Sequence, residues 1–203
     1  MRVFFARHGE SEANVARVFS TRGWKHPLTT AGREQARALA GRLAGHDVMA
    51  IWSSPLRRAV ETAVVLTGQL GVPHVTDPAL GEYDVGMYDG LPYADAAERV
   101  ADLEARWDRG ERDARLPGGE SCNDILARFE PFVGRLIEQF ASMEAAIVVV
   151  SHGGTLGRAL PVVLKGVVLD GGTPRPLGYT AVVEAELRDG VLHCVSWGDS
   201  PPA

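Results

Sequence analysis

Residues 1–10 read Met-Arg-Val-Phe-Phe-Ala-Arg-His-Gly-Glu, and this segment gives the clearest indication of how the chain folds. Its first part is mainly apolar, with Val and Phe, and a glycine follows His8, so the pattern predicts a buried strand that ends at Arg7–His8. Residues 47–54 and 145–151 form two further runs of this kind. Nearly continuous apolar strands are typical of a parallel sheet that is covered on both faces.

Helical periodicity appears between these predicted strands. Thr29 or Thr30 can cap a first helix, and Ser121 with Asp124 resembles a capping box before a third one. The residues expected to share a buried face are Ala36, Leu39, Ala40 and Leu43 in the first helix, Leu56, Val60, Ala63, Val64 and Thr67 in the second, and Ile125, Phe129, Phe132, Val133, Leu136, Ile137 and Phe140 in the third. Strands that alternate with helices predict an α/β fold, a three-layer sandwich with a mostly parallel sheet and helices on both faces.

The rest of the chain is expected to complete one domain. Residues 180–187 and 191–197 alternate in polarity around the turn Asp189-Gly190, which predicts a β-hairpin. Residues 83–119 are rich in Gly, Asp, Arg and Glu and lack a sheet pattern, so we expect a partly helical cap over the sheet edge. With 45% hydrophobic content, residues 1–203 are expected to form a single domain that carries this cap as an insertion.

Composition excludes several classes of protein. The formal net charge of −5 argues against a partner that is nucleic acid or an acidic membrane surface. Cys122 and Cys194 are far apart and form no metal-binding pattern, so neither a zinc ribbon nor a disulfide scaffold is expected. The sequence shows no signal peptide and no apolar run long enough to span a bilayer, so we expect a cytoplasmic protein. The tail, residues 199–203, is expected to fray.

Two histidines follow the ends of predicted strands, in the motifs Arg7-His8-Gly9-Glu10 and Ser151-His152-Gly153-Gly154. Ligands of open α/β sheets bind outside the carboxyl ends of the strands, so both imidazoles can face one site. The glycine after each histidine, Gly153 in the second motif, lets the backbone approach a ligand closely. A helix is expected to start there, and its free N–H groups would suit an anion.

Two more segments add charged groups to the same edge. Arg57 and Arg58 follow the predicted strand 47–54 at the start of a helix, and arginine suits bidentate binding of a phosphoryl group. The segment Leu80-Gly-Glu-Tyr-Asp-Val-Gly86 puts a carboxylic acid, Glu82, at the entrance to the cap.

These segments, in this order, resemble the histidine phosphatase superfamily, also called the phosphoglycerate mutase-like family. The similarity covers Arg7 to Gly154 and includes RHGE, SPLRRAxET, LGExxxG, PGGES (residues 117–121) and SHGG. The resemblance implies that His8 is the nucleophile, that Arg7, Arg58 and His152 hold the phosphate, and that Glu82 donates a proton. It further implies that Asn14 lies near the phosphate and that no cofactor or metal is needed.

The chemistry of the side chains agrees with these roles. Neutral imidazole is a competent nucleophile near neutral pH, because its ordinary pKa is about 6.5. Phosphoryl transfer needs mainly positioning and charge stabilisation, which arginines and backbone N–H groups supply. An alkoxide leaves poorly, so an acid must protonate it. The sequence therefore predicts a phosphatase that hydrolyses small phosphomonoesters through a phosphohistidine on His8.

Several alternatives stay open. A cofactor-dependent phosphoglycerate mutase would return the phosphoryl group to a second hydroxyl, although the resemblance implies a longer chain between acid and second histidine than the 69 residues of this protein (83–151). A metal-dependent hydrolase could use His8, His152 and Glu82 as ligands, but HExxH or a similar spacing is missing. An inactive binding protein is the third alternative.

The partner and one loop are less closely defined. The expected partner is a small phosphorylated metabolite, and a homodimer is an open alternative to a monomer. Where members of the superfamily often carry a GxxDxPLT-like segment, this chain has Gly23-Trp-Lys-His-Pro-Leu-Thr29, one residue shorter and without aspartate. This segment is expected to border the substrate.

Overall fold

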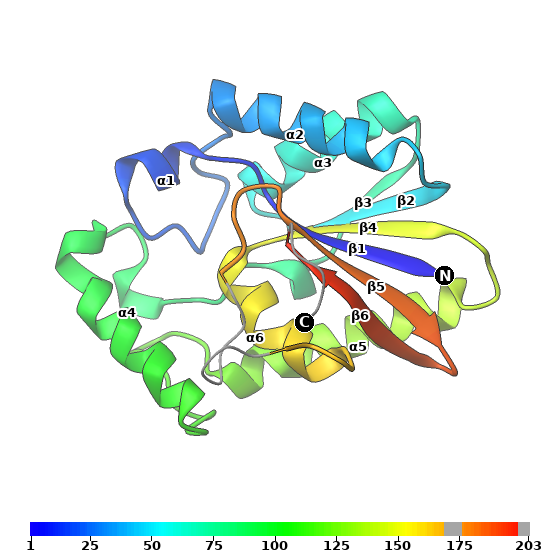
Figure 1. Ribbon diagram of the computed structural model, residues 1–203. Coiled ribbons are helices and arrows are strands. Elements are labelled where there is room, and N and C mark those ends of the chain that lie inside the picture. The colour runs from blue at the N-terminus through cyan, green and yellow to red at the C-terminus, as the bar shows by residue number, and fades with distance from the viewer. Residues whose placement is uncertain (169–175, 199–203) are drawn as a thin grey trace.

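The structure, a computed structural model, describes residues 1–168 and 176–198. Within these ranges the strands form one six-stranded sheet in the order β3-β2-β4-β1-β5-β6 (Figure 1). The strands are β1 (Arg2–Arg7), β2 (Val48–Ser53), β3 (His74–Thr76), β4 (Ala146–Ser151), β5 (Val182–Arg188) and β6 (Val191–Trp197). The helices are α1 (Glu12–Ala16), α2 (Thr30–Leu43), α3 (Arg57–Leu70), α4 (Tyr93–Asp108), α5 (Cys122–Phe140) and α6 (Gly153–Val163), with short 3-10 helices η1 (Pro78–Leu80) and η2 (Gly86–Tyr88).

Strand β1 joins the two halves of the core. Val3 and Phe5 point to the face covered by α5 and α6, while Phe4 and Ala6 pack with residues of α2 and α3 on the opposite face. All four side chains are buried, and burial of a large apolar side chain stabilises the fold by about 1.5–3 kcal/mol. The predicted α/β sandwich with helices on both faces is confirmed (Figure 1).

The pairing register of the sheet determines where the histidines emerge. Strands β1 and β4 are parallel neighbours, and Arg7 at the end of β1 pairs with Ser151 at the end of β4. The next residue of each strand is a histidine, so His8 and His152 leave the sheet side by side. Strand β2 is parallel to β4 on its other side, and its last residue, Ser53, pairs with Val150.

The helices confirm two of the three predicted faces. The expected residues of α2 are buried, and Thr29 caps this helix by accepting a hydrogen bond from the N–H of Gly32. The capping box of Ser121 and Asp124 in front of α5 is also confirmed. The face assigned to α3 is wrong: Val64 is 56% exposed, and the buried residues are Arg58, Ala59, Thr62, Ala63 and Leu66. The buried face differs from the predicted one because the polar side chains of Arg58 and Thr62 point inward, and an apolar pattern does not include them.

The remaining elements lie at the edges. The predicted hairpin is confirmed as β5 and β6, which are antiparallel around Asp189-Gly190, and β5 also pairs antiparallel with β1. Helix α1 is the helix start expected after the first histidine motif, whereas β3 was not predicted, because three residues are too few for a periodic pattern. The residues expected to fray, 199–203, lie outside the described residues.

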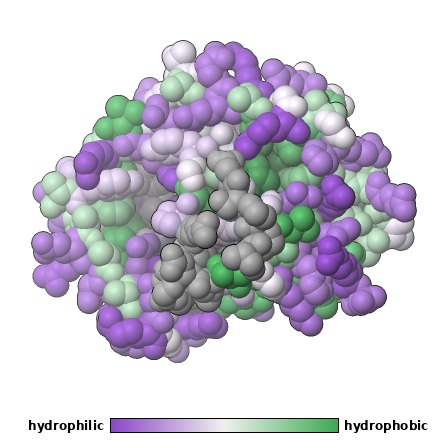
Figure 2. All heavy atoms as spheres, viewed as in Figure 1, coloured by the Kyte–Doolittle hydropathy of each residue, from purple (hydrophilic) through white to green (hydrophobic). Residues whose placement is uncertain are grey.

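Segment 83–119 contains one long helix, α4, which buries Ala96, Val100, Leu103 and Trp107. This helix lies on the side of the molecule toward which β1 and β4 run (Figure 1). On the face drawn in Figure 2, hydrophilic residues predominate and hydrophobic residues form small separate areas. Among the described helices, none combines the length and the apolar character that a bilayer crossing requires.

Candidate active site

The imidazoles of His8 and His152 meet at the carboxyl edge of the sheet. Their ring centroids are 5.0 Å apart in an edge-on arrangement, and both residues are buried. The predicted convergence of the two motifs is therefore confirmed. The cause is the parallel register of β1 and β4, which brings the ends of the two strands together.

Hydrogen bonds fix the protons of both rings. Nδ1 of His8 lies 2.6 Å from the carbonyl oxygen of Gly9. A carbonyl can only accept, so Nδ1 carries the proton and Nε2 keeps its lone pair. In His152, Nδ1 accepts from Arg58 Nη2 at 3.0 Å, so Nε2 donates to Ser54 Oγ at 2.7 Å.

Both histidines are held in the neutral form. Burial lowers the pKa of His8 well below its ordinary value, and the positive charges of Arg58 and Arg7 lower it further. Burial is also the main cause of the lowered pKa of His152, followed by the charge of Arg58. Neutral imidazole is the nucleophilic form, so His8 is available for attack across the physiological pH range.

Arg58 links the two imidazoles. Its Nε donates to Nε2 of His8 at 3.0 Å, while Nη2 contacts His152. The neighbouring Arg57 instead pairs with Glu61 at 2.7 Å on the partly exposed side of α3. Thr62, one turn after Arg58, accepts from the N–H of Gly9 at 3.1 Å and donates to the carbonyl of Arg58 at 2.8 Å. This contact ties the start of α3 to the first histidine motif.

Arg7 lies beside the histidines, and its Nε–H group is buried without a hydrogen-bond partner among the described residues. Its Nη1 donates to the carbonyl of Leu177 at 2.7 Å, and its guanidinium stacks over the ring of Tyr179 at 4.5 Å. A buried unpaired donor such as this Nε–H group is costly, so an acceptor oxygen in the cavity would satisfy it. Gly153 lies against this side chain, since a Cβ there would be 3.4 Å from Arg7 Cδ and Nε.

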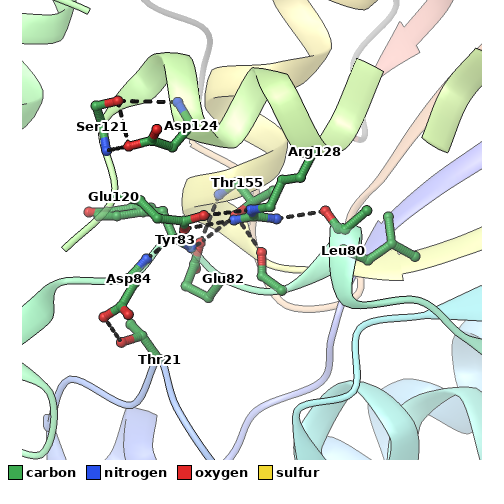
Figure 3. Close-up of polar contacts among 12 residues, drawn as sticks. Thr21, Leu80, Glu82, Tyr83, Asp84, Glu120, Ser121, Asp124, Arg128 and Thr155 are labelled. Atoms are coloured by element: carbon green, nitrogen blue, oxygen red, sulfur yellow. Dashed lines mark hydrogen bonds and ion pairs between the residues drawn. The ribbon is translucent and has the colours of Figure 1, made fainter. Parts of the chain in front are cut away.

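Glu82 reaches the start of α6 (Figure 3). Its Oε1 accepts from the N–H groups of Tyr83 at 3.0 Å and Thr155 at 2.8 Å and from Thr155 Oγ1 at 3.1 Å, while Oε2 accepts from the N–H of Gly154 at 3.3 Å. Position 154 needs glycine, because a Cβ there would lie 2.3 Å from Tyr83 Cε1. These contacts hold the carboxylate at the positive end of the helix dipole, in the cavity wall.

The PGGES element supports the loop that carries Glu82 (Figure 3). Glu120 accepts from the N–H of Asp84 at 2.9 Å and forms a bidentate pair with Arg128, at 2.8 and 3.0 Å. Arg128 also donates to the carbonyl of Ala79 at 2.6 Å. A Cβ at Gly119 would lie 2.5 Å from the carbonyl oxygen of Asp84, so only glycine lets the two backbones approach. The element therefore acts on Glu82 through the backbone.

A cavity of about 180 Å³ opens above the histidines. Arg7, His8, Asn14, Arg58 and Glu82 all line it, whereas His152 lies behind Arg58 and Gly153 does not line it. Oδ1 of Asn14 accepts from the N–H and the hydroxyl of Ser11, at 3.0 and 2.8 Å, which completes the capping box of α1. Asn14 thus stabilises the start of α1 and also lines the cavity.

The divergent segment 23–29 does not line the cavity, although all of its residues are described; residues 18–21 do so from that side. Its end instead anchors the fold, since Leu28 is buried and its N–H donates to Glu61 at 2.9 Å. Residues 18–21 therefore line the cavity where the resemblance led us to expect segment 23–29.

Several cavity residues were missed by sequence reasoning. Phe19, Tyr83, Tyr93 and Glu104 also line the cavity. Tyr83 occupies a variable position of the LGExxxG motif, and the other three lie outside all recognised motifs. Thr155 and Ser54, which hold Glu82 and His152, directly follow or lie within recognised motifs, so the motif context could have identified them. In the described part of the chain, no group of three or more His, Cys, Asp or Glu side chains is arranged to hold a metal ion.

A family model, the histidine phosphatase superfamily (branch 1), matches residues 3–200. The chain belongs to this superfamily, and proteins similar to it are named as phosphatases and as mutases.

Individual relatives differ in their activities. The chain is 36% identical to a 2,3-bisphosphoglycerate-dependent phosphoglycerate mutase of Methylobacterium sp. (strain 4-46) over 81% of each protein. It is 39% identical over 74% of its length to the "Bifunctional protein Rv2228c" of Mycobacterium tuberculosis, of which it spans only 41%. Among solved structures, the mycobacterial glucosyl-3-phosphoglycerate phosphatase Rv2419c with VO3 superposes with a TM-score of 0.81 and 27% identity, over 98% of this chain and 99% of that one.

Proposed function

We propose that the protein is a phosphatase that hydrolyses small phosphomonoesters through a phosphohistidine formed on His8. The observation that carries this proposal is the fixed tautomer of His8. Its Nδ1–H donates to the carbonyl oxygen of Gly9, with 2.6 Å between the nitrogen and the oxygen. Its Nε2 carries the lone pair and lies 3.0 Å from Nε of Arg58. A neutral nucleophile beside a buried guanidinium suits attack on an anionic phosphoryl group.

The first half-reaction forms the phosphohistidine. The phosphoryl oxygens accept from the Nε–H group of Arg58, which frees the lone pair of His8, and from the unpaired Nε–H group of Arg7. Nε2 attacks phosphorus and the bond from phosphorus to the ester oxygen breaks. Glu82 takes part in this step as the protonated carboxyl group, which gives its proton to the departing alkoxide and becomes the carboxylate. His152, fixed through Arg58 and Ser54, keeps the guanidinium oriented.

The second half-reaction releases inorganic phosphate. Water attacks phosphorus, the nitrogen–phosphorus bond breaks, and the carboxylate of Glu82 takes the proton from the water. We favour hydrolysis over transfer because the family resemblance implies a longer chain between the acid and the second histidine in a mutase than the 69 residues from 83 to 151 of this protein. No step requires a cofactor.

The test is phosphate release from p-nitrophenyl phosphate by the purified protein without bisphosphoglycerate. We expect turnover that vanadate inhibits, because vanadate mimics five-coordinate phosphorus, and that dialysis against EDTA leaves unchanged. His8→Gln should abolish it, while His193→Gln on the distant strand β6 serves as the matched control. Equal activity of the two variants, or loss of activity in EDTA, would refute the proposal.

Mutase activity is the second candidate, because the chain is similar to bisphosphoglycerate-dependent mutases over most of its length. A mutase would interconvert phosphoglycerates with a bisphosphoglycerate primer and release little phosphate. Parallel assays of phosphoglycerate isomerisation and phosphate release therefore separate the two activities.

A further inference from the structure

The cap end of the cavity carries a second carboxylate. Helix α4 supplies Tyr93 and Glu104 to the wall, and Tyr83 and Phe19 lie there as well. Glu104 belongs to none of the recognised motifs and takes no part in the proposed transfer of the phosphoryl group. Its position in the cavity that contains His8 makes it a candidate for contact with the rest of the substrate.

The carboxylate of Glu104 is held by a buried partner. Its Oε1 accepts from the hydroxyl of Tyr83 at 2.8 Å, and the ring of Tyr83 packs edge-on against Trp107 with centroids 5.3 Å apart. Burial raises the pKa of Tyr83 well above its ordinary value, and the negative charges of Glu104 and Glu82 raise it further. The phenol therefore stays protonated and donates to Glu104, which fixes the direction of the carboxylate.

Charged side chains of both signs line the cavity. Arg7 and Arg58 lie beside His8, where they would neutralise the phosphoryl group. The other two charged residues in the described lining, Glu82 and Glu104, are acidic. A substrate with a second anionic group away from its phosphate would bring like charges together, which is unfavourable in a partly buried site.

The remaining lining favours hydroxyl groups. Asn14, Ser20 and Thr21 are polar and uncharged, and the ring of Tyr93 packs on Phe19 with centroids 4.5 Å apart. A carboxylate accepts hydrogen bonds from hydroxyls, and an aromatic wall suits the C–H face of a polyol or sugar. The hydroxyl groups of such a substrate can donate hydrogen bonds to Glu104, and they add no negative charge at the cap end of the cavity.

We propose that Glu104 is a specificity-determining residue that favours polyol or sugar monophosphates and disfavours phosphomonoesters with a second anionic group. This inference rests on the proposed phosphatase function. Every candidate substrate carries a phosphoryl group, so the phosphate end of the cavity cannot distinguish one phosphomonoester from another. The cap end can, because it contacts the part of the substrate that differs.

The test compares glycerol 3-phosphate with 3-phosphoglycerate, which differ only in a hydroxymethyl group or a carboxylate at the end remote from phosphate. We expect the wild-type protein to prefer glycerol 3-phosphate in kcat/KM by at least about tenfold. Glu104→Gln keeps an acceptor for Tyr83 and removes the charge. It should narrow this ratio by about fivefold or more, mainly through a lower KM for 3-phosphoglycerate.

Glu98→Gln, on the exposed side of α4, is the matched control and should leave the ratio unchanged. A wild-type ratio near one, or an unchanged ratio in Glu104→Gln with an unchanged melting temperature, would overturn the inference. Turnover of p-nitrophenyl phosphate reports the proposed function separately. If it is retained while the ratio does not move, only the selectivity is wrong, whereas absence of all phosphate release would refute both.

Discussion

The two ends of the cavity are built in different ways. At the sheet edge, His8, Arg58 and His152 directly follow paired strands or begin a helix, and all three are at least 95% buried. At the cap end, Tyr93 and Glu104 come from one helix and are only partly buried. The pairing of β1 with β4 fixes the first group, whereas the packing of helix α4 fixes the second.

This difference separates chemistry from substrate choice. Residues held by the central sheet cannot move without disturbing the core, so the phosphoryl-transfer end is rigid. Exposed or partly buried residues of helix α4 can change without affecting that end. One fold can therefore serve many phosphorylated substrates, in agreement with the different activities named for the relatives of this chain.

Arg58→Met, at the sheet edge, should produce the largest loss of activity. The side chain keeps its length but loses the N–H groups that face both imidazoles, so kcat/KM for p-nitrophenyl phosphate should fall by about 10³-fold. Arg57→Met, one residue earlier and paired only with Glu61, is the matched control and should change activity less than about twofold. Similar losses in the two variants would mean that the sheet-edge group is not the reacting end.

The loss of activity in Glu82→Gln should depend on how readily the leaving group departs from phosphorus. Hydrolysis of glycerol 3-phosphate should slow by about 10²-fold, and hydrolysis of p-nitrophenyl phosphate by less than about tenfold, because a good leaving group needs less proton donation. A thermal melt checks that the contacts with Gly154 and Thr155 still hold the loop. Equal losses for both substrates would exclude Glu82 as the acid.

The stability of the protein should fall as the pH drops below about 6.5. Both His8 and His152 have lowered pKa values in the folded state, so the unfolded chain binds more protons in this range. Each histidine contributes up to about 1.4 kcal/mol per pH unit to the slope of the unfolding free energy. This slope is measured by urea unfolding at a series of pH values, from neutral pH down to about pH 5, just above the range in which carboxylates titrate. His8→Gln should make the slope shallower, and a slope equal to that of the wild-type protein would mean that His8 is not held neutral by the fold.

Tyr179→Leu should produce the smallest effect. The ring stacks on Arg7 at 4.5 Å, and loss of a cation–π contact worth about 0.5–1 kcal/mol should raise KM for p-nitrophenyl phosphate about two- to fivefold. Tyr179→Phe keeps the aromatic face and is the control. If Phe and Leu behave alike, the stacking does not position Arg7.

The sequence predicted the sheet-edge group better than the cap end for a physical reason. His8 and His152 follow strands whose apolar pattern is unmistakable, and the topology of a parallel sheet brings such ends together. Arg58 was identified from its place in a motif. The apolar face of α3 was wrong at Val64, because periodicity cannot show that Arg58 and Thr62 point inward.

Glu104 and Tyr93 could not be predicted from the sequence. Each lies in a helix whose charged residues resemble those of any solvated surface, and only the packing of α4 against the loop of Tyr83 turns Glu104 toward the cavity. The hydrogen bond from Tyr83 to Glu104 joins two residues that are 21 positions apart, so no local pattern of the sequence indicates it.

The identity of the phosphorylated side chain tests the role of His8 most directly. The protein is mixed with a radiolabelled phosphomonoester, quenched in alkali, which preserves phosphohistidine, and digested for mass spectrometry. We expect a label on His8, attached through Nε2, and no label in His8→Gln. A label on His152, on an acidic side chain or on any other residue would contradict a phosphohistidine mechanism through His8.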